Sequence, residues 1–301
     1  MLRRAPENGA LEVSVMKLTL TWLFARSPFH PDLLTHFAKE ADRLGFDAVE
    51  TPEHVAFPVG FQSKYPYTPD GSFPSGDEFP IPDPLLPLAY VAASTTRLKF
   101  GTYVIILPQH HPLYLAKQMA TLDVLSRGRT FIGIGSGWLK EEFDSLGIDF
   151  HRRGARTDEA IQAMRVLWRD NPSTFRGRHF NFGPLRSFPK PVQKGGIPIL
   201  VGGISAPAIR RAARYGDGFL AVPGGPGLAE LIGQLRQECE RIGRDFNQIE
   251  LSGQCRATYD GVRRLQDLGI QRAHTLIPFT TDTDEITRSL ERVANDVLVK
   301  L

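Results

Sequence analysis

The segment 198–220 reads PILVGGISAPAIRRAARYGDGFL. It opens with the apolar run Ile199–Val201, turns on Gly202-Gly203, and continues with a small-residue, arginine-rich stretch of helical period. A second apolar run follows at 218–222. Strand, helix and strand in this order indicate parallel pairing, because parallel neighbours need a crossover. The paired glycines indicate either a tight turn or bare backbone that faces a ligand.

The rest of the chain repeats this unit. Short apolar runs bounded by Gly, Pro or Asp indicate strands, and apolar residues three and four apart indicate helices. Strands are expected at 17–23, 47–52, 98–107, 129–135, 197–202, 217–222, 248–253 and 273–279. Helices are expected at 31–44, from about Pro84, at 112–125, 139–169, 205–215, 227–242, 259–268 and 283–298. Eight strand–helix units predict the α/β class and a closed (β/α)8 TIM barrel.

Two connections are too long to be turns. Residues 55–83, after the second strand, are rich in proline and aromatic residues, which predicts a lid over the barrel mouth that contains Tyr65 and Tyr67. A mobile surface insertion is the alternative. Residues 170–196, after the helix of the fourth strand, form the second insertion, in which FRGRHFNF is expected to be a small hairpin or extended ribbon.

The ends of the chain suggest one barrel domain preceded by an arm. Residues 1–15 lack an apolar signal core and are expected to be a disordered arm, and Met16 is an alternative start. Residues 16–301 are expected to form a single domain. Cys239 and Cys255 form no CxxC pair, which favours reduced thiols and a cytoplasmic location.

Composition and motifs exclude several classes of protein. The net charge is +3, and the Lys and Arg residues are scattered without interleaved aromatics, so nucleic acid is not an expected partner. No apolar run approaches about 18 residues, so no membrane span is expected. His110-His111 has neither HExxH spacing nor a clear acidic partner, and no metal site is expected. A glycosidase would need a second carboxylate near Glu53, and none stands at a strand end.

Chemistry in such a barrel belongs at the carboxyl ends of the strands. The residues expected there are Glu53 and His54 after the second strand, Tyr103 and Val104 in the third, Gly135, Ser136, Gly137 and Trp138 after the fourth, and Gly202, Gly203, Ile204 and Ser205 after the fifth. His54 suits proton exchange because its ordinary pKa lies near neutrality, although a packed histidine is the alternative. Glu53 is expected to take part in catalysis and cofactor binding by orienting a hydrogen-bond donor, and a solvated carboxylate is the alternative.

The two glycine clusters would open at the same face. Neither matches the dinucleotide-binding fingerprint, and glycines at barrel strand ends also relieve crowding. A flat ring system that approaches bare backbone would explain both clusters together. The segment Gly202–Ser205 also precedes a helix, where free N–H groups, the Ser205 hydroxyl and the helix dipole predict an anion site.

From Met16 to about Ala294 the chain resembles the bacterial luciferase-like flavin and deazaflavin oxidoreductases. The resemblance is carried by EADRLGFDAVETPEHV, TRLKFGTYVIILPQHHPLYLAKQMATLDVLSRGRTFIGIGSGWLKEEFDSLG, RTDEAIQAMRVLW, PKPVQKGGIPILVGG and AARYGDGFL. The long loop after the second strand resembles the branch described as probable coenzyme F420-dependent oxidoreductases. The resemblance implies hydride transfer between F420 and a small organic substrate. The alternatives are an FMN-dependent monooxygenase and a flavin-binding protein without turnover.

The resemblance also implies roles for particular residues. The cofactor ring would lie across the strand ends and its phosphate at Gly202, Gly203 and Ser205. A non-prolyl cis peptide would join Tyr103 and Val104. His54 would exchange protons beside the ring. Trp138 stands where some deazaflavin enzymes carry a catalytic Glu, so no residue is assigned that acid role. With Tyr65 and Tyr67, Trp138 is expected to contact the substrate or the lid. A bacterial protein that forms a homodimer is expected.

Overall fold

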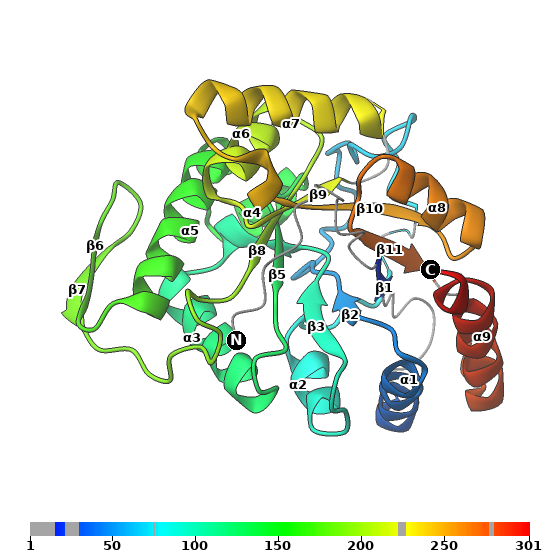
Figure 1. Ribbon diagram of the computed structural model, residues 1–301. Helices are drawn as coiled ribbons and strands as arrows, with labels where there is room; N and C mark the ends of the chain where they lie inside the picture. Colours follow the sequence, from blue (N-terminus) through cyan, green and yellow to red (C-terminus); the bar gives the residue numbers. More distant parts are fainter. Residues whose placement is uncertain (1–15, 22–29, 75, 77, 222–226, 277–279) are drawn as a thin grey trace, which may run out of the picture.

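The computed structural model describes residues 16–21, 30–74, 76, 78–221, 227–276 and 280–301. Its main sheet is parallel, with strand order β3-β2-β1-β11-β10-β9-β8-β5-β4 (Figure 1). Strands β3 (Lys99–Thr102) and β4 (Ile105–Ile106) belong to one chain segment. Because β3 pairs with β2 and β4 pairs with β5, the sheet returns to its starting segment and closes. The predicted closed barrel is confirmed.

Every expected strand and helix has a counterpart among the described residues. The other barrel strands are β1 (Lys17–Thr21), β2 (Ala48–Thr51), β5 (Ile132–Gly135), β8 (Ile199–Gly202), β9 (Gly218–Ala221), β10 (Glu250–Arg256) and β11 (Arg272–Leu276). The helices are α1 (Pro31–Leu44), α2 (Leu86–Ala92), α3 (Pro112–Leu125), α4 (Lys140–Ser145), α5 (Arg153–Arg169), α6 (Ala206–Tyr215), α7 (Leu228–Ile242), α8 (Tyr259–Asp267) and α9 (Thr283–Asp296). The expected arm at 1–15 and the expected strand ends at 22–23, 222 and 277–279 lie outside the described residues.

Two expected elements are each divided. The strand expected at 98–107 is interrupted between β3 and β4, where the predicted non-prolyl cis peptide Tyr103-Val104 is present. The helical region expected at 139–169 consists of two helices, because α4 stops before Gly147 and α5 starts only at Arg153. Gly147 has a φ of +67°, a left-handed conformation that ends a helix.

Helix α1 shows how local sequence sets the element bounds. Pro31 occupies its first position, where a missing N–H costs no helical hydrogen bond. Its buried residues Leu34, Phe37 and Ala41 recur three and four apart and form one apolar stripe. Gly45, in the left-handed conformation, ends the helix, and the chain enters β2 within three residues.

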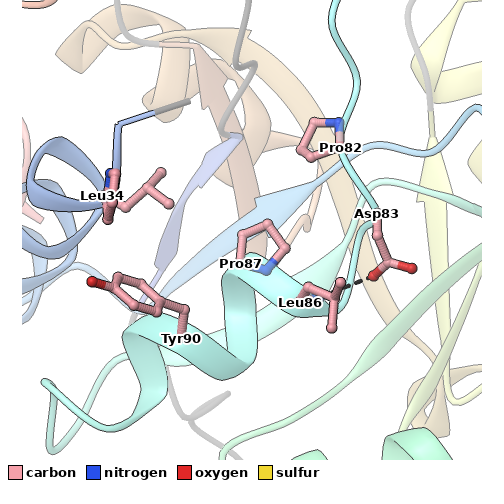
Figure 2. Close-up of a pocket in the computed structure, with 7 residues that line it drawn as sticks. Leu34, Pro82, Asp83, Leu86, Pro87 and Tyr90 are labelled. Carbon is pink, nitrogen blue, oxygen red and sulfur yellow. Dashed lines mark hydrogen bonds between the residues drawn. The ribbon is translucent and has the colours of Figure 1, made fainter. Parts of the chain in front are cut away.

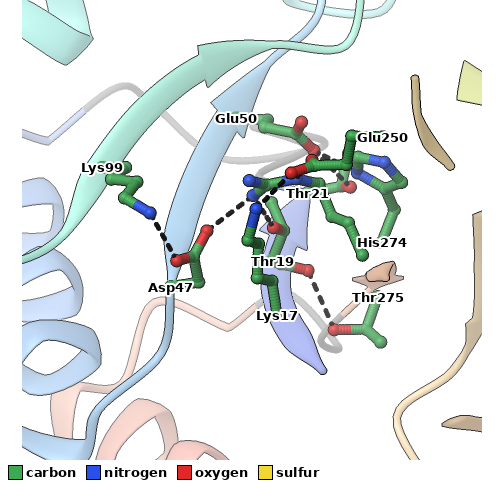
Figure 3. A network of polar contacts seen from close by, with 10 residues as sticks. Lys17, Thr19, Thr21, Asp47, Glu50, Lys99, Glu250, His274 and Thr275 are labelled. Atoms are coloured by element: carbon green, nitrogen blue, oxygen red, sulfur yellow. Dashed lines mark hydrogen bonds and ion pairs between the residues drawn. The ribbon is translucent and has the colours of Figure 1, made fainter. Parts of the chain in front are cut away.

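The barrel interior holds a charged network at the amino-terminal ends of the strands (Figure 3). Arg272, whose side chain is only 4% exposed, donates hydrogen bonds of 2.6 Å to both Glu250 and Asp47. Lys17 pairs with Glu250, and Lys99 pairs with Asp47 at 2.9 Å. An apolar layer is formed by buried Ala48, Phe131, Leu200 and Leu220 with partly buried Tyr103 and Val104. The interior is therefore a packed core rather than a pore.

Both insertions appear where expected. Strands β6 (Ser173–Arg176) and β7 (Asn181–Leu185) form an antiparallel hairpin that projects beside α5 (Figure 1), which confirms the predicted hairpin. The described part of the loop 55–83 contains neither helix nor strand. Among the described helices, none combines the length and the apolar character needed to span a membrane.

Candidate active site

His54 lies just beyond the carboxyl end of β2 and is paired with a carboxylate. Its Nδ1 lies 3.0 Å from Oε2 of Glu142, which is in the first turn of α4. The side chains of His54 and Glu142 are only 8% and 1% exposed. A carboxylate at Nδ1 fixes the orientation of the imidazole and leaves Nε2 as the ring atom that gives or takes a proton.

Aromatic side chains enclose this histidine. The ring of His54 lies 4.5 Å from that of Phe57, 5.6 Å from Trp138 and 5.9 Å from Phe73. Tyr65 contacts the ring of Trp138 at 5.2 Å, and Tyr67 contacts Tyr65 at 5.2 Å. We call the set of His54, Phe57, Phe61, Tyr65, Tyr67, Phe73 and Trp138 the aromatic cluster. The loop 55–83 therefore packs its aromatic residues against His54.

Two glutamates of α4 hold this loop in place. Glu142 Oε1 accepts hydrogen bonds from the backbone N–H groups of Val55 at 2.6 Å and Ala56 at 3.2 Å. Glu141 accepts from the backbone N–H of Gln62 at 2.7 Å and from the Ser63 hydroxyl at 2.6 Å. The loop is thus fastened at two points to the helix that also orients His54.

The electrostatics favour an ionised Glu142. Burial alone would raise the pKa of this carboxyl, but hydrogen bonds from His54, Gln109 and the N–H of Ala56 outweigh burial and lower it. In the loop, burial raises the pKa of Tyr67 to about 12 and also raises the pKa of Tyr65. Both tyrosines are therefore neutral hydrogen-bonding groups at physiological pH.

Glu53 has its carboxylate occupied by the protein itself. Its Oε2 accepts a 2.6 Å hydrogen bond from the backbone N–H of Ile106, and its Oε1 lies 2.8 Å from Nε2 of His110. The expectation that His110 has no acidic partner was wrong, because the partner is 57 residues away in sequence. Glu53 stabilises the segment just beyond the cis peptide, and its side chain is buried rather than solvated.

The Glu53–His110 pair predicts a pH dependence of stability. Burial alone would lower the pKa of His110, but the hydrogen bond and the charge of Glu53 outweigh burial and raise it from 6.5. A raised folded-state pKa contributes stability that is complete below the unfolded value and is lost as the pH rises through the folded one. The free energy of unfolding should therefore fall as the pH increases above 6.5. His110→Gln, which keeps a donor but does not titrate, should flatten this slope in urea titrations across the pH series. Equal slopes for the two proteins would contradict the assignment.

The glycines at the strand ends are required by the chain. A Cβ on Gly135 would lie 2.9 Å from Cγ2 of Val104, and one on Gly202 would lie 3.3 Å from its Cγ1. Gly203 has a φ of +133°, and Gly137 has a φ of +78°. Relief of crowding and unusual backbone conformation therefore account for all four glycines. The paired glycines of the segment 198–220 end β8 and lead toward α6, and contacts and backbone conformation within the chain explain both of them.

The start of α6 is the candidate anion site. Ser205 caps the helix by accepting from the N–H of Ala208 at 3.4 Å, and the N–H of Gly203 donates to Leu220 at 3.4 Å. Pro207 has no N–H. Within the described part of the chain, the N–H groups left to bind an anion there are those of Ile204, Ser205 and Ala206. The N–H of Gly203, which was expected to bind the anion, is therefore occupied by Leu220.

Arg211 connects α6 to α5 and to the loop that follows β5. From α6 it donates to the Ser136 hydroxyl at 3.1 Å, to the carbonyl of Gly154 at 3.0 Å and to Asp158 at 2.5 Å. Its side chain is 6% exposed. The buried guanidinium therefore holds the loop of Ser136 in a fixed position beside the anion site.

The comparisons with known proteins agree with this geometry. Residues 14–260 match the family model described as "Luciferase-like monooxygenase". The chain belongs to this family. An uncharacterized protein of Mycobacterium tuberculosis is 34% identical over 276 residues, covering 88% of this chain and 94% of the relative. A protein of Kineococcus radiotolerans named F420-dependent glucose-6-phosphate dehydrogenase is 31% identical, covering 81% of this chain and 68% of the relative.

A solved structure supports the fold of this luciferase-like enzyme. The coenzyme F420-dependent tetrahydromethanopterin reductase of Methanopyrus kandleri superposes with a TM-score of 0.74 over 95% of this chain and 99% of that one. The sequence identity is 15%, so the likeness concerns the barrel alone. The family makes the chain a luciferase-like oxidoreductase.

Some site residues of the luciferase-like enzyme were not expected from its sequence. Glu142, the carboxylate that pairs with His54, was not expected from the sequence. The feature of the sequence that could have indicated Glu142 is the pair of acidic residues Glu141 and Glu142 in the first turn of a helix that follows a barrel strand. Among the described residues no group of His, Cys, Asp and Glu could hold a metal ion.

A separate pocket lies outside the barrel mouth (Figure 2). It has a volume of about 350 Å³ and is lined by apolar residues of α1 and α2, with Asp83 as its acidic residue. Asp83 accepts from the N–H groups of Leu85 and Leu86 at 2.8 and 2.9 Å, and so caps α2. Because the Asp83 carboxylate serves to cap α2, the candidate active site of the luciferase-like enzyme remains at His54.

Proposed function

We propose that the enzyme transfers a hydride between coenzyme F420 and a small organic substrate. The observation that carries the proposal is the His54–Glu142 pair, which lies at a strand end beneath an aromatic loop. A reduction by hydride needs a proton at a second atom of the substrate, and a buried, carboxylate-oriented histidine is a suitable source. The relative named for F420 dependence supports the choice of cofactor.

The residues of the mouth fit such a cofactor. Bound F420 would supply or accept the hydride, and its phosphate would be held by the N–H groups of Ile204, Ser205 and Ala206. Tyr103 and Val104 would lie beside the ring. The aromatic cluster would exclude water, and His54 Nε2 would hold the proton that the substrate takes up or releases. Glu53 would keep the segment after β4 in place.

Cofactor titration tests this proposal. Purified protein would be mixed with reduced F420 and, separately, with reduced FMN, each in air and without oxygen. We expect tight binding of F420 and reoxidation that depends on an added organic acceptor and not on oxygen. Binding of neither cofactor would refute the proposal.

An FMN-dependent monooxygenase is the second candidate, and the family description favours it. In that case reduced FMN would bind and its reoxidation would require oxygen. A flavin-binding protein without turnover would bind cofactor tightly and show no reoxidation that depends on a substrate. The same titration therefore separates all three functions.

The anion site gives a prediction of its own. Ser205→Gly removes the hydroxyl, and a glycine at this position costs the helix only a few tenths of a kcal/mol. We expect affinity for FMN, which carries a phosphate, to fall about tenfold or more, since hydrogen bonds to charged groups contribute about 1.5–3 kcal/mol. Affinity for riboflavin, which lacks the phosphate, should not change. Thr258→Gly, which removes the same kind of cap from α8, is the control. An equal loss of FMN and riboflavin affinity would show that Ser205 acts only on the fold.

A further inference from the structure

A second buried histidine–carboxylate pair lies inside the barrel. Nδ1 of His274 on β11 lies 2.8 Å from Oε2 of Glu50 on β2, and the same oxygen accepts a 3.4 Å hydrogen bond from Thr21. Both side chains of the pair are 0% exposed (Figure 3). The pair is separate from the His54–Glu142 pair and has no part in the function proposed above.

The other polar atom of each side chain has no partner. Oε1 of Glu50 and Nε2 of His274 are buried and make no hydrogen bond within the described residues. Leaving a buried polar group unpaired costs about 1–3 kcal/mol, and more if it is charged. Two such atoms on one bonded pair indicate that a further group completes the arrangement.

The Glu50–His274 pair lies inside the barrel, near the carboxyl ends of β1 and β2. Thr21 is the last residue of β1 and pairs in register with Glu50, which stands three residues before Glu53. The ring of Tyr103, at the cis peptide, lies 4.8 Å from the ring of His274 and donates its hydroxyl to Gln254 at 3.3 Å. Tyr103 and Gln254 are partly exposed, so the pair is one side chain away from the open end of the barrel.

The chemistry of the two unpaired atoms indicates which partner fits. Oε1 of Glu50 is a carboxyl oxygen, which accepts hydrogen bonds, so its missing partner must be a donor. A hydroxyl or amino group supplies that donor and also carries a lone pair and a hydrogen with which to meet Nε2 of His274.

We propose that Glu50 and His274 form a subsite that binds a hydroxyl or amino group of the organic substrate. This inference rests on the proposed function, because it takes the mouth to be the place where the substrate binds. An alcohol or amine can meet both unpaired atoms, whereas an ether or a tertiary amine would leave Oε1 of Glu50 without a donor. Sites built around a buried hydrogen bond reject analogues that lack the bonding group. The pair therefore makes the enzyme selective for substrates that carry a donor.

The first test uses the wild-type protein with ¹⁵N-labelled histidine rings. The probes are cyclohexanol and 2-propanol, each compared with its methyl ether, which has the same skeleton but no donor. We expect the alcohols to shift the Nε2 resonance of His274, identified by its absence from His274→Gln, and to bind about tenfold tighter than the ethers. An equal response to alcohols and ethers would overturn the proposal. So would a bridging water that remains in a crystal structure soaked with either alcohol.

The second test uses Glu50→Gln, which keeps the shape and removes the charge. The preference for alcohol over ether should fall to near unity, while Glu291→Gln, a carboxylate change on the exposed face of α9, should keep it. Cofactor titration on the same proteins separates this inference from the proposed function. Normal F420 binding without any donor preference would refute the subsite alone, and a donor preference without cofactor binding would refute the function alone. If Glu50→Gln fails to fold, the wild-type resonances decide.

Discussion

Replacing His54 with alanine is expected to lower turnover by about 10²- to 10⁴-fold, the usual contribution of a positioned acid or base. The barrel should remain folded, because His54 lies after β2 and contributes no strand residue. Cofactor affinity should change little, since the candidate anion site lies at α6. The measurements are turnover, cofactor affinity and thermal unfolding on the same preparation.

Glu142→Gln distinguishes proton exchange from packing. The amide keeps the volume of the side chain and removes the carboxylate that orients the imidazole. We expect turnover to fall less than in His54→Ala, because the imidazole remains but loses the carboxylate that orients it. His151→Ala, at an exposed position, is the matched control and should leave all three quantities unchanged. Full turnover in a folded His54→Ala protein would remove this residue from the mechanism.

Arg272→Met is expected to cause the largest loss of stability, about 3–5 kcal/mol, because removing one partner of a buried pair leaves the others uncompensated. Burial would raise the pKa of Asp47 and of Glu250, but the charge of Arg272, followed by that of a lysine, outweighs burial and lowers both. Methionine fills the space without charge and leaves the two carboxylates without this cation. Urea unfolding measures the loss.

Arg263→Met supplies the comparison for Arg272. Arg263 pairs with Asp267 on the surface of α8, with both side chains more than half exposed. Exposed pairs of this kind contribute between zero and about 1 kcal/mol. If Arg272→Met loses no more stability than Arg263→Met, the charged network at the amino ends of the strands is not structural. Cofactor affinity should survive in both variants, because neither residue lies at the mouth.

The fold was predictable because its signals are local and repeated. Pro31 and Gly45 mark the two ends of α1, and the expected bounds 31–44 match those observed. The break between β3 and β4 could not be read from the apolar run 98–107, because an interrupted strand and a continuous one have the same hydrophobic pattern. Gly147 was the overlooked signal for the break between α4 and α5.

The candidate site was predictable only in part. His54 stood out because it follows a strand, whereas its partner Glu142 is 88 residues away, and such a pairing is invisible without the folded chain. Glu50 and His274 lie within short apolar stretches and were read as ordinary strand residues. The glycines were expected to leave bare backbone for a ligand. The structure gives another reason for them, because the side chain of Val104 lies so close to Gly135 and Gly202 that a side chain there would be crowded.

The hydrogen bonds between Glu142 and the loop 55–83 couple the position of this loop to the protonation of the carboxylate. Glu142 receives hydrogen bonds from the backbone at Val55 and Ala56 and, through its other oxygen, from His54. Any movement of the loop that withdraws the backbone donors raises the proton affinity of Glu142, and protonation of Glu142 in turn loosens the loop. Movement of the loop that admits a substrate and the orientation of the His54 ring by ionised Glu142 are therefore thermodynamically linked. The Glu142 carboxylate thus couples the position of the loop 55–83 to the acid–base group of His54.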